Sequence, residues 1–357
     1  MAIGIEGWEL AQPGDPLRRS RRTVEAPGAG EALVRVAACG VCHTDLGYAF
    51  DGVRTRHPLP LVLGHEIAGH VEAVGAGAEA LLGKAVVVPA VIPCGTCSAC
   101  RAGRGAICDA QVFPGSDVHG GFASHLLVPA RGLCVVDEAR LGQAGLALAD
   151  LAVVADAVTT PYQAAVNAGL AAGDVAIVVG AGGVGGFAVQ IAAALGAHVA
   201  AIDVDAERLR LAGEHGASLT LDGKGDAKAI RKSLVAWAKE RGAPATQWKI
   251  FETSGSKPGQ ELAFSLLNPG AHLAVVGYTR DPGSFRLSNL MAFDATARGT
   301  WGCLPEHYPA AVELVLSGKV KLAAFVERRP MSTINAVFAE LRAHTLKKRP
   351  VLIPDFA

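Results

Sequence analysis

The chain has 357 residues, half of them hydrophobic, and its 33 basic and 33 acidic side chains give a net charge of zero. This length is sufficient for two domains with buried cores. The balanced charge argues against a partner held by bulk electrostatics, which excludes nucleic acid and a charged membrane surface as the main partner.

The sequence favours a cytoplasmic protein without a membrane segment. The first ten residues include Glu6 and Glu9 and lack the pattern of a secretory signal. Residues 175–202 carry no Asp, Glu, Lys or Arg and are long enough to cross a bilayer. However, five glycines between residues 180 and 186 favour a buried strand, a turn and a buried helix over a single span.

The predicted secondary structure changes character near Ala152. Before it, short β-rich runs alternate with Gly and Pro turns, which is typical of a β-rich domain; these runs are 32–37, 67–74, 85–91 and 122–128. After it, strands and helices alternate, which indicates a doubly wound parallel sheet. Its expected strands are 175–179, 199–202, 218–221, 248–252, 271–276 and 300–301. One expected helix begins at 184, and two more cover 206–215 and 228–241.

The C-terminal part is predicted to contain two helices and one strand. The helices are expected at 308–316 and 334–344. The final strand, at 349–353, could return to the first domain.

A glycine-rich run, Gly180-x-Gly182-x-x-Gly185, follows the strand predicted at 175–179 and precedes an alanine-rich helix. In this context the glycines permit a tight turn, close approach of a pyrophosphate and helix packing. Asp203 ends the next strand, where a carboxylate accepts ribose hydroxyls and repels a 2′-phosphate, so NAD is expected rather than NADP. The alternative is a packing turn, with Asp203 acting only as a helix cap.

Four of the eight cysteines lie within fifteen residues of one another, at Cys94, Cys97, Cys100 and Cys108. Four thiolates form a closed tetrahedral set for zinc, with no position for water or substrate. We therefore expect this site to stabilise a lobe of the chain. The alternatives are an iron–sulfur site or free thiols.

The motifs GVCHTD (40–45) and GHE (64–66), the four-cysteine cluster and the later glycine run occur in the order and spacing of the zinc-containing medium-chain alcohol dehydrogenases. The whole chain resembles this family. The resemblance implies an α/β protein with a GroES-like β-rich catalytic domain over 1–152 that holds both zinc sites. It also implies a Rossmann NAD-binding domain over 153–300 and a return to the catalytic domain over 301–357.

The resemblance implies a second, catalytic zinc site. Cys42 and His65 match zinc ligands of the family, and Asp156 occupies the third position, which is often Cys. Aspartate is a harder ligand that zinc accepts. The alternative is that Asp156 only caps the following helix.

Other residues take expected roles from the same motifs. Glu66 matches a carboxylate that can approach the metal, and Asp45 one that orients the histidine ligand. Thr44 matches the hydroxyl that takes the substrate proton, and His43 a basic residue at the cofactor pyrophosphate. The NAD contacts are expected at His43, Gly180, Gly182, Gly183, Val184, Gly185, Asp203, Arg208 and Val276.

The chain departs from the family at the proton relay. Many members carry a histidine five residues after the first zinc ligand, whereas this chain has Gly47. We expect a shortened relay or one through water, and His57 is a candidate replacement.

The resemblance implies NAD-linked oxidation of a secondary alcohol at a zinc ion. Several segments further resemble a branch of the family that oxidises a cyclic acyl-CoA alcohol in anaerobic aromatic degradation, among them GVCHTDLGYAFDGVRT, FETSG and WGCLPEHYPAAVELVL. Small residues at Gly47 and Ala49 would leave room for a ring. Arginines that could meet CoA phosphates are Arg18, Arg19, Arg21, Arg22, Arg54 and Arg56.

Three other functions remain open: a small- or aromatic-alcohol dehydrogenase, a reductase of a conjugated C=C bond, and a non-catalytic binding protein. The resemblance also suggests a homodimer or homotetramer, with an edge strand near Thr300–Trp301 as the interface. Cys39, Cys134 and Cys303 are expected to be buried small hydrophobic residues.

Overall fold

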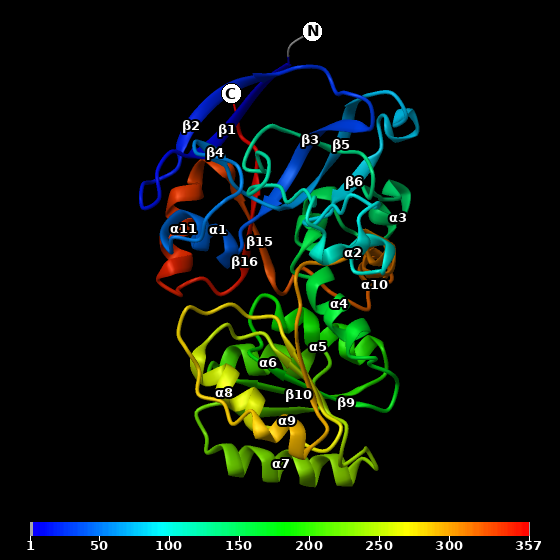
Figure 1. The fold of residues 1–357 in the computed structure, drawn as a ribbon, viewed down its shortest axis with the longest axis vertical. Helices are drawn as coiled ribbons and strands as arrows, with labels where there is room; N and C mark the ends of the chain where they lie inside the picture. The colour runs from blue at the N-terminus through cyan, green and yellow to red at the C-terminus, as the bar shows by residue number, and fades with distance from the viewer. Residues whose placement is uncertain (1–2, 357) are drawn as a thin grey trace. The chain divides into compact units, whose positions relative to one another are not determined.

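Two sheets organise the first of two compact units in the computed structural model, which describes residues 3–356 (Figure 1). This unit comprises the chain up to Thr159, Gly302–Leu316 and the chain from Phe325 onward. Its strands are β1 (Ile3–Leu10), β2 (Arg18–Val24), β3 (Glu31–Gly40), β4 (Leu61–Val62), β5 (Glu66–Val74), β6 (Ala85–Val88), β7 (His125–Pro129), β8 (Cys134–Val135), β15 (Val326–Pro330) and β16 (Arg349–Ile353).

The helices of this unit are short and lie between the strands. They are α1 (His43–Phe50), α2 (Ser98–Arg101), α3 (Glu138–Gln143), α10 (Tyr308–Leu316) and α11 (Ile334–Arg342), with 3₁₀ turns η1 (Glu79–Leu81), η2 (Gly105–Ile107), η3 (Leu148–Ala155), η4 (Pro305–His307) and η5 (Met331–Thr333).

The strands of the first unit pair in two groups. One sheet has the order β2-β1-β4, and the other the order β15-β16-β3-β5-β6-β8, with β7 also paired to β3. Strand β16, red in Figure 1, pairs with β3, so the end of the chain returns to the first unit as expected.

The second unit contains Thr160–Trp301 and Ser317–Ala324. Its six parallel strands have the order β11-β10-β9-β12-β13-β14, the arrangement of a doubly wound dinucleotide-binding fold. The strands are β9 (Val175–Val179), β10 (His198–Asp203), β11 (Leu219–Asp222), β12 (Lys249–Glu252), β13 (His272–Val275) and β14 (Thr296–Gly299). The helices are α5 (Gly185–Ala194), α6 (Ala206–Glu214), α7 (Ala227–Glu240), α8 (Lys257–Ser265) and α9 (Ser288–Ala292), while α4 (Thr159–Asn167) begins at the unit boundary.

Burial on both faces explains the uncharged run in this sheet. All five residues of β9 are buried. Val175, Ile177 and Val179 belong to a core that includes Leu234 of α7 and the fully buried Trp248. A parallel strand covered on both sides reads as a continuous apolar stretch. No helix in the described part of the chain is both long and apolar enough to cross a membrane.

The predicted architecture, a β-rich domain and a parallel doubly wound sheet, is confirmed. Three elements match their predicted limits: β9, α10 and β16. The strand predicted at 85–91 ends at Val88 because Pro89 has no N–H for the ladder.

The strand predicted at 300–301 is wrong, because β14 lies at Thr296–Gly299. Thr300 still donates a hydrogen bond to the carbonyl of Val275, but Gly302 has φ +52° and turns the chain. The unit boundaries also differ from the expected ones: residue 152 lies inside η3, and residues 317–324 lie in the second unit rather than in a C-terminal return.

Candidate metal centres and cofactor site

Four side chains from separate parts of the first unit converge at one point. Cys42 precedes α1, His65 lies between β4 and β5, Glu66 begins β5, and Asp156 directly follows η3. One ligand atom from each lies within 4.8 Å of the others. Asp156 Oδ2 is 3.8 Å from Cys42 Sγ and 3.6 Å from His65 Nε2. The structure therefore brings together the three residues expected to ligate the catalytic metal.

Asp45 connects the segment that carries Cys42 with the segment that carries His65. Its fully buried carboxylate accepts hydrogen bonds from the backbone N–H groups of Cys42, at 2.9 Å, and Gly64, at 3.2 Å. The same carboxylate lies 3.4 Å from His65 Nδ1. A carboxylate at this nitrogen fixes the orientation and tautomer of the ring, so that Nε2 faces the cluster.

The position of Asp156 depends on its neighbour Ala155. The carbonyl of Ala155 accepts hydrogen bonds from the Tyr308 hydroxyl and from Thr159 Oγ1, the latter at 3.1 Å. Tyr308 is fully buried and its oxygen also accepts the N–H of Ala90, at 3.0 Å. Sequence reasoning did not identify Tyr308, because an aromatic residue at the start of a helix is usually core packing.

The donor set fits zinc. Sulfur, imidazole nitrogen and carboxylate oxygen are all zinc donors, and three protein ligands leave one coordination position for substrate. Neither ring nitrogen of the buried His65 has a well-aligned hydrogen-bond partner among residues 3–356. Burial lowers the pKa of His65, but the carboxylates of Asp45 and Asp156 outweigh it and raise the pKa well above its usual value. The surroundings of this ring therefore stabilise positive charge.

Glu66 is held by an arginine that the sequence did not reveal. Arg349, the first residue of β16, donates from Nε to Glu66 Oε2 at 2.9 Å and from Nη2 to Oε1. Both side chains are buried. A Cβ atom on Gly40 would lie 2.1 Å from Glu66 Oε2, so the space for the carboxylate depends on that glycine. Arg349 stood in the sequence as the first residue of an apolar strand, where a buried ion pair is uncommon.

The four-cysteine cluster has the geometry of a closed metal site. Its Sγ atoms lie 3.9 Å apart for Cys94 and Cys100, 3.5 Å for Cys97 and Cys100, and 3.7 Å for Cys97 and Cys108. A zinc–sulfur bond of about 2.3 Å gives tetrahedral edges of about 3.8 Å.

Backbone amides also prepare these sulfurs for a metal. Hydrogen bonds from the N–H and hydroxyl of Thr96 and the N–H of Cys97 lower the pKa of Cys94 to about 5, whereas burial raises the pKa of Cys100 to about 12. Cys108 Sγ accepts the N–H of Cys94 at 3.3 Å. Amide donors favour the thiolate form, which is the form that binds zinc.

Residues Gly180 to Gly185 form a tight turn after β9 in the second unit. Gly180 has φ +92°, a conformation that favours glycine. A Cβ atom on Gly185 would lie 1.7 Å from the carbonyl oxygen of Gly180, so the packing of α5 on the turn requires glycine. Thr253, at the end of β12, donates from Oγ1 to the carbonyls of Val179 (3.1 Å) and Gly180 (2.6 Å). Thr253 supports the turn and was not identified from the sequence.

The acidic residue expected at the ribose ends β10 beside this turn. Asp203 is buried, and its Oδ2 accepts the N–H of Ala181 at 2.6 Å while Oδ1 accepts the N–H of Asp205 at 2.9 Å. Arg208 Nη1 lies 3.9 Å from Asp203 Oδ2 and close to Gly182. The structure therefore gathers the glycines, the carboxylate and the arginine at the carboxyl edge of one sheet, where dinucleotides bind in this fold.

The remaining predicted cofactor residues lie as follows. Gly183 and Val184 are half-buried at the start of α5, and the N–H of Val276 donates to the carbonyl of Glu252 at 2.9 Å. In the first unit, the ring of His43 stacks on His344 with a centroid distance of 6.2 Å. Cys39, Cys134 and Cys303 are free and buried, as expected.

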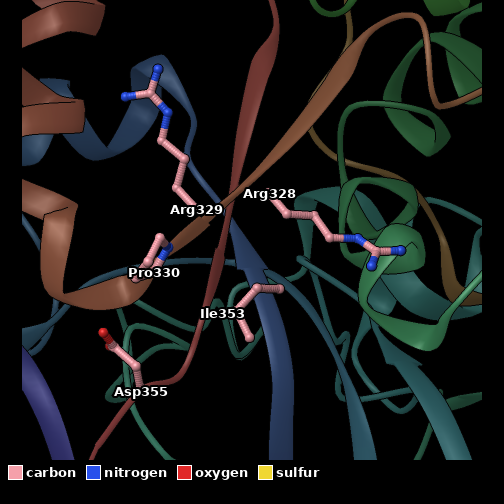
Figure 2. A pocket seen from close by; sticks show the side chains of 5 residues that line it. All are labelled: Arg328, Arg329, Pro330, Ile353 and Asp355. Carbon is pink, nitrogen blue, oxygen red and sulfur yellow. The ribbon is translucent and has the colours of Figure 1, made fainter.

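A cavity of about 260 Å³ elsewhere in the first unit is not a candidate metal or cofactor site. Figure 2 shows that Arg328 and Arg329, which line it, point in opposite directions. Arg328 pairs with Asp150 at 2.6 Å and Arg329 with Glu340 at 2.8 Å. These guanidinium groups are therefore already neutralised.

Two family models match the chain: an alcohol dehydrogenase GroES-like domain over residues 28–138 and a zinc-binding dehydrogenase over residues 183–317. The alcohol dehydrogenase of Geobacillus stearothermophilus is 32% identical over 330 residues, which cover 91% of this chain and 93% of that enzyme.

Solved structures show the same similarity. Galactitol-1-phosphate dehydrogenase from Escherichia coli matches with a TM-score of 0.86 and 27% identity, covering 98% of this chain and 100% of its own. The alcohol dehydrogenase of Aeropyrum pernix matches with a TM-score of 0.83 and 30% identity, with the same coverage.

The chain therefore belongs to the zinc-containing medium-chain alcohol dehydrogenase family. Within that family it is a zinc-dependent oxidoreductase acting on CH–OH groups.

Replacing Asp156 by alanine tests the unusual third ligand. We expect the zinc content, measured by plasma mass spectrometry after dialysis, to fall from about two ions per chain towards one, because a site with only Cys42 and His65 holds zinc weakly. Asp150→Ala, which removes the half-buried carboxylate that pairs with Arg328 in the same 3₁₀ turn, should retain both ions. An Asp156→Ala protein that keeps two tightly bound ions would show that Asp156 is not a ligand.

Replacing Arg349 by methionine tests the buried ion pair. The change leaves the Glu66 carboxylate buried without its partner, so the free energy of unfolding should fall by about 3–5 kcal/mol. Urea unfolding followed by circular dichroism measures this loss, with the exposed Lys347→Met as a control. Adding Glu66→Gln to Arg349→Met should recover part of the loss; no recovery in the double variant would contradict a direct pairing.

Proposed function

We propose that this enzyme oxidises 6-hydroxycyclohex-1-ene-1-carbonyl-CoA to the 6-oxo thioester with NAD, as in anaerobic benzoyl-CoA degradation. The observation that carries alcohol oxidation is the convergence of Cys42, His65 and Asp156. The ring thioester is supported by the resemblance of segments along the whole chain to 6-hydroxycyclohex-1-ene-1-carbonyl-CoA dehydrogenase. Small residues in α1 support it further.

A zinc ion held by Cys42, His65 and Asp156 would supply a Lewis acid that makes a bound alcohol more acidic. Thr44 would receive the alcohol proton, which is supported by the position of its Oγ1 at 3.6 Å from Cys42 Sγ at the start of α1. Asp45 keeps the histidine ligand oriented, and Glu66 remains paired to Arg349 behind the cluster.

The onward route of the proton differs from the common relay. Gly47 stands at the relay position, and its carbonyl accepts the N–H groups of Asp51 and Val53 at 3.1 Å each. The side chain of Val53 lies 3.4 Å from where a Cβ on Gly47 would be. We propose that water carries the proton onward from Thr44, because glycine at this position has no side chain that could accept it.

NAD is the proposed hydride acceptor, bound at the turn from Gly180 to Gly185. The carboxylate of Asp203 would accept the ribose hydroxyls of NAD and repel a 2′-phosphate, which is supported by its contact with the turn at Ala181. Arg208 would lie beside the adenosine, and His43 would meet the pyrophosphate. In this proposal residues 1–152 together with Asp156 supply the two zinc sites, and the glycine turn and Asp203 within residues 153–300 bind NAD.

The second unit also offers a surface for a second copy of the chain. Strand β14 is an edge strand whose four residues are exposed. Large apolar side chains in the chain segments before and after β14 are exposed as well; they are Tyr278, Phe285, Leu287, Met291 and Trp301. An unpaired edge with apolar neighbours is typical of an oligomer contact, which supports a homodimer or homotetramer.

A substrate panel tests the proposed reaction. We expect the ring-alcohol thioester to give the highest kcat/KM in an NADH absorbance assay, above cyclohexanol and benzyl alcohol. The product should have two hydrogens fewer than the substrate by mass spectrometry. Faster oxidation of benzyl alcohol would favour the small- or aromatic-alcohol enzyme, and NADH-dependent reduction of the ring C=C bond would favour a reductase.

Thr44 should be needed for the proton transfer whichever alcohol is oxidised. Thr44→Val should lower kcat about 100-fold or more, because a positioned proton acceptor contributes at least that factor. Thr44→Ser keeps the hydroxyl and should retain most of the activity. Equal activity in the Val and Ser variants would rule out Thr44 as the acceptor.

A further inference from the structure

Glu252 ends β12 in the second unit and carries a buried carboxylate that the reaction described above does not use. In the parallel register it lies between Val179 of β9 and Val275 of β13, and it is 1% exposed. Its Oε2 has no hydrogen-bond partner in the described part of the chain. Burial raises the pKa of Glu252, whereas hydrogen bonds from Ser254 and Gly255 lower it. Burying a carboxylate is costly, so we expect this one to have a specific role.

Oxygen Oε1 of Glu252 holds the loop that follows β12. It accepts hydrogen bonds from the N–H of Ser254 at 2.8 Å, from Ser254 Oγ at 2.5 Å and from the N–H of Gly255 at 3.1 Å. The N–H of Ser256 in turn donates to Ser254 Oγ at 3.2 Å, just before α8 begins. One carboxylate oxygen therefore determines the path of the chain from β12 towards α8.

The loop that follows β13 is held by the backbone of the same residue. The carbonyl of Glu252 accepts the N–H of Val276 at 2.9 Å and the N–H of Gly277 at 3.0 Å. A Cβ atom on Gly277 would lie 2.2 Å from the nitrogen of Gly255 and 2.9 Å from Glu252 Oε2. Gln260 of α8 donates from Nε2 to the carbonyl of Gly277 at 3.3 Å. The two loops are therefore in direct contact, and Glu252 holds both.

The loop after β12 also lies against the glycine turn after β9. A Cβ atom on Gly180 would lie 2.5 Å from both the nitrogen and the Cα atom of Ser254. Thr253 Oγ1 donates to the carbonyl of Gly180 at 2.6 Å. A displaced Ser254 backbone would press directly on Gly180, because no side chain lies between them to absorb the shift.

The strand order indicates which half of a dinucleotide lies near Glu252. Strands β10 and β11 extend the sheet on one side of β9, and β12, β13 and β14 extend it on the other. A dinucleotide binds across such a reversal, with one nucleotide on each side. Asp203 of β10 takes the adenosine ribose in the proposed NAD site, so the ends of β12 and β13 face the nicotinamide half. Val276 and Gly277 are half-buried there and remain accessible to a ligand.

We propose that Glu252 is a positioning residue for the nicotinamide half of NAD, because it fixes the two loops that would contact this half. The carboxylate does not touch the cofactor; it aligns the backbone of both loops, and a misaligned nicotinamide would be badly placed for hydride transfer. The inference rests on the proposed NAD site at the turn from Gly180 to Gly185. It does not depend on the proposed thioester substrate.

Fluorescence titration of the zinc-loaded enzyme with NADH tests this role. Glu252→Leu has a similar size but no acceptor, so the Kd for NADH should rise about tenfold or more as the loop N–H groups lose their partner. Glu252→Gln keeps an oxygen that can replace Oε1, and its Kd should stay within about threefold of the parent value. A Gln variant that binds NADH as weakly as the Leu variant would overturn the role of this oxygen, and so would a Leu variant that binds like the parent.

The adenosine half of the cofactor separates positioning from general damage to the second unit. AMP carries only that half, so its Kd, measured by calorimetry, should change less than about twofold in Glu252→Leu. Leu234→Ala truncates a fully buried side chain of α7 in the same unit and should lower the Tm without weakening NADH. If Glu252→Leu weakens AMP and NADH equally, or if Leu234→Ala weakens NADH as much, the effect is structural and the proposal is overturned.

A milder change covers a Leu variant that folds poorly. Ser254→Ala removes the hydroxyl that donates to Glu252 Oε1 and should raise the Kd for NADH about threefold. Added to Glu252→Leu, it should weaken NADH no further, because the two changes remove the same hydrogen bond. Full additivity would contradict the proposal. If the Leu variant does not fold, the Ser254→Ala variant decides, and an unchanged Kd overturns the proposal.

Asp203→Ala distinguishes failure of this inference from failure of the proposed NAD site. It should weaken both NADH and AMP, because it removes the carboxylate at the adenosine ribose. NADH binding that depends on neither Asp203 nor Glu252 would contradict the NAD site itself. Binding that depends on Asp203 but not on Glu252 would overturn only the positioning role.

Discussion

The constraint on which the first unit depends is the concentration of acidic groups around a single buried imidazole. Asp45, Glu66 and Asp156 surround His65, and Cys42 adds a thiol. Buried carboxylates are stable only when cations or hydrogen bonds neutralise them. Arg349 neutralises Glu66, backbone amides stabilise Asp45, and a divalent ion satisfies the rest. Other residues help to hold these groups together. Gly40 leaves space for the Glu66 carboxylate, and Tyr308 fixes Ala155, the residue before Asp156.

The same need for a cation explains why the third ligand can be aspartate. A carboxylate beside a thiolate would repel it without a metal between them, so Asp156 and Cys42 favour an occupied site. Tyr308 and Thr159 both donate to the carbonyl of Ala155, which fixes the residue before the ligand. The four-cysteine cluster achieves stability in another way, through amide donors to its sulfurs. The cluster of Cys42, His65 and Asp156 leaves one coordination position open, whereas the four cysteines fill all four positions.

Much of this arrangement could be predicted from sequence, because it depends on local patterns. The apolar run of β9, the glycine turn and Asp203 follow one another along the chain, and so do the four cysteines. Residues that act through long-range contacts could not be predicted. Arg349 meets Glu66 across 283 positions, and Tyr308 meets Ala155 across 153.

Anomalous diffraction from crystals of the purified enzyme, recorded at the zinc absorption edge, tests the central claim most directly. The account predicts two peaks per chain. One should lie within the four cysteines, and the other at about 2.0–2.3 Å from Cys42 Sγ, His65 Nε2 and an oxygen of Asp156. Fully active crystals with a peak at the four cysteines alone would contradict it.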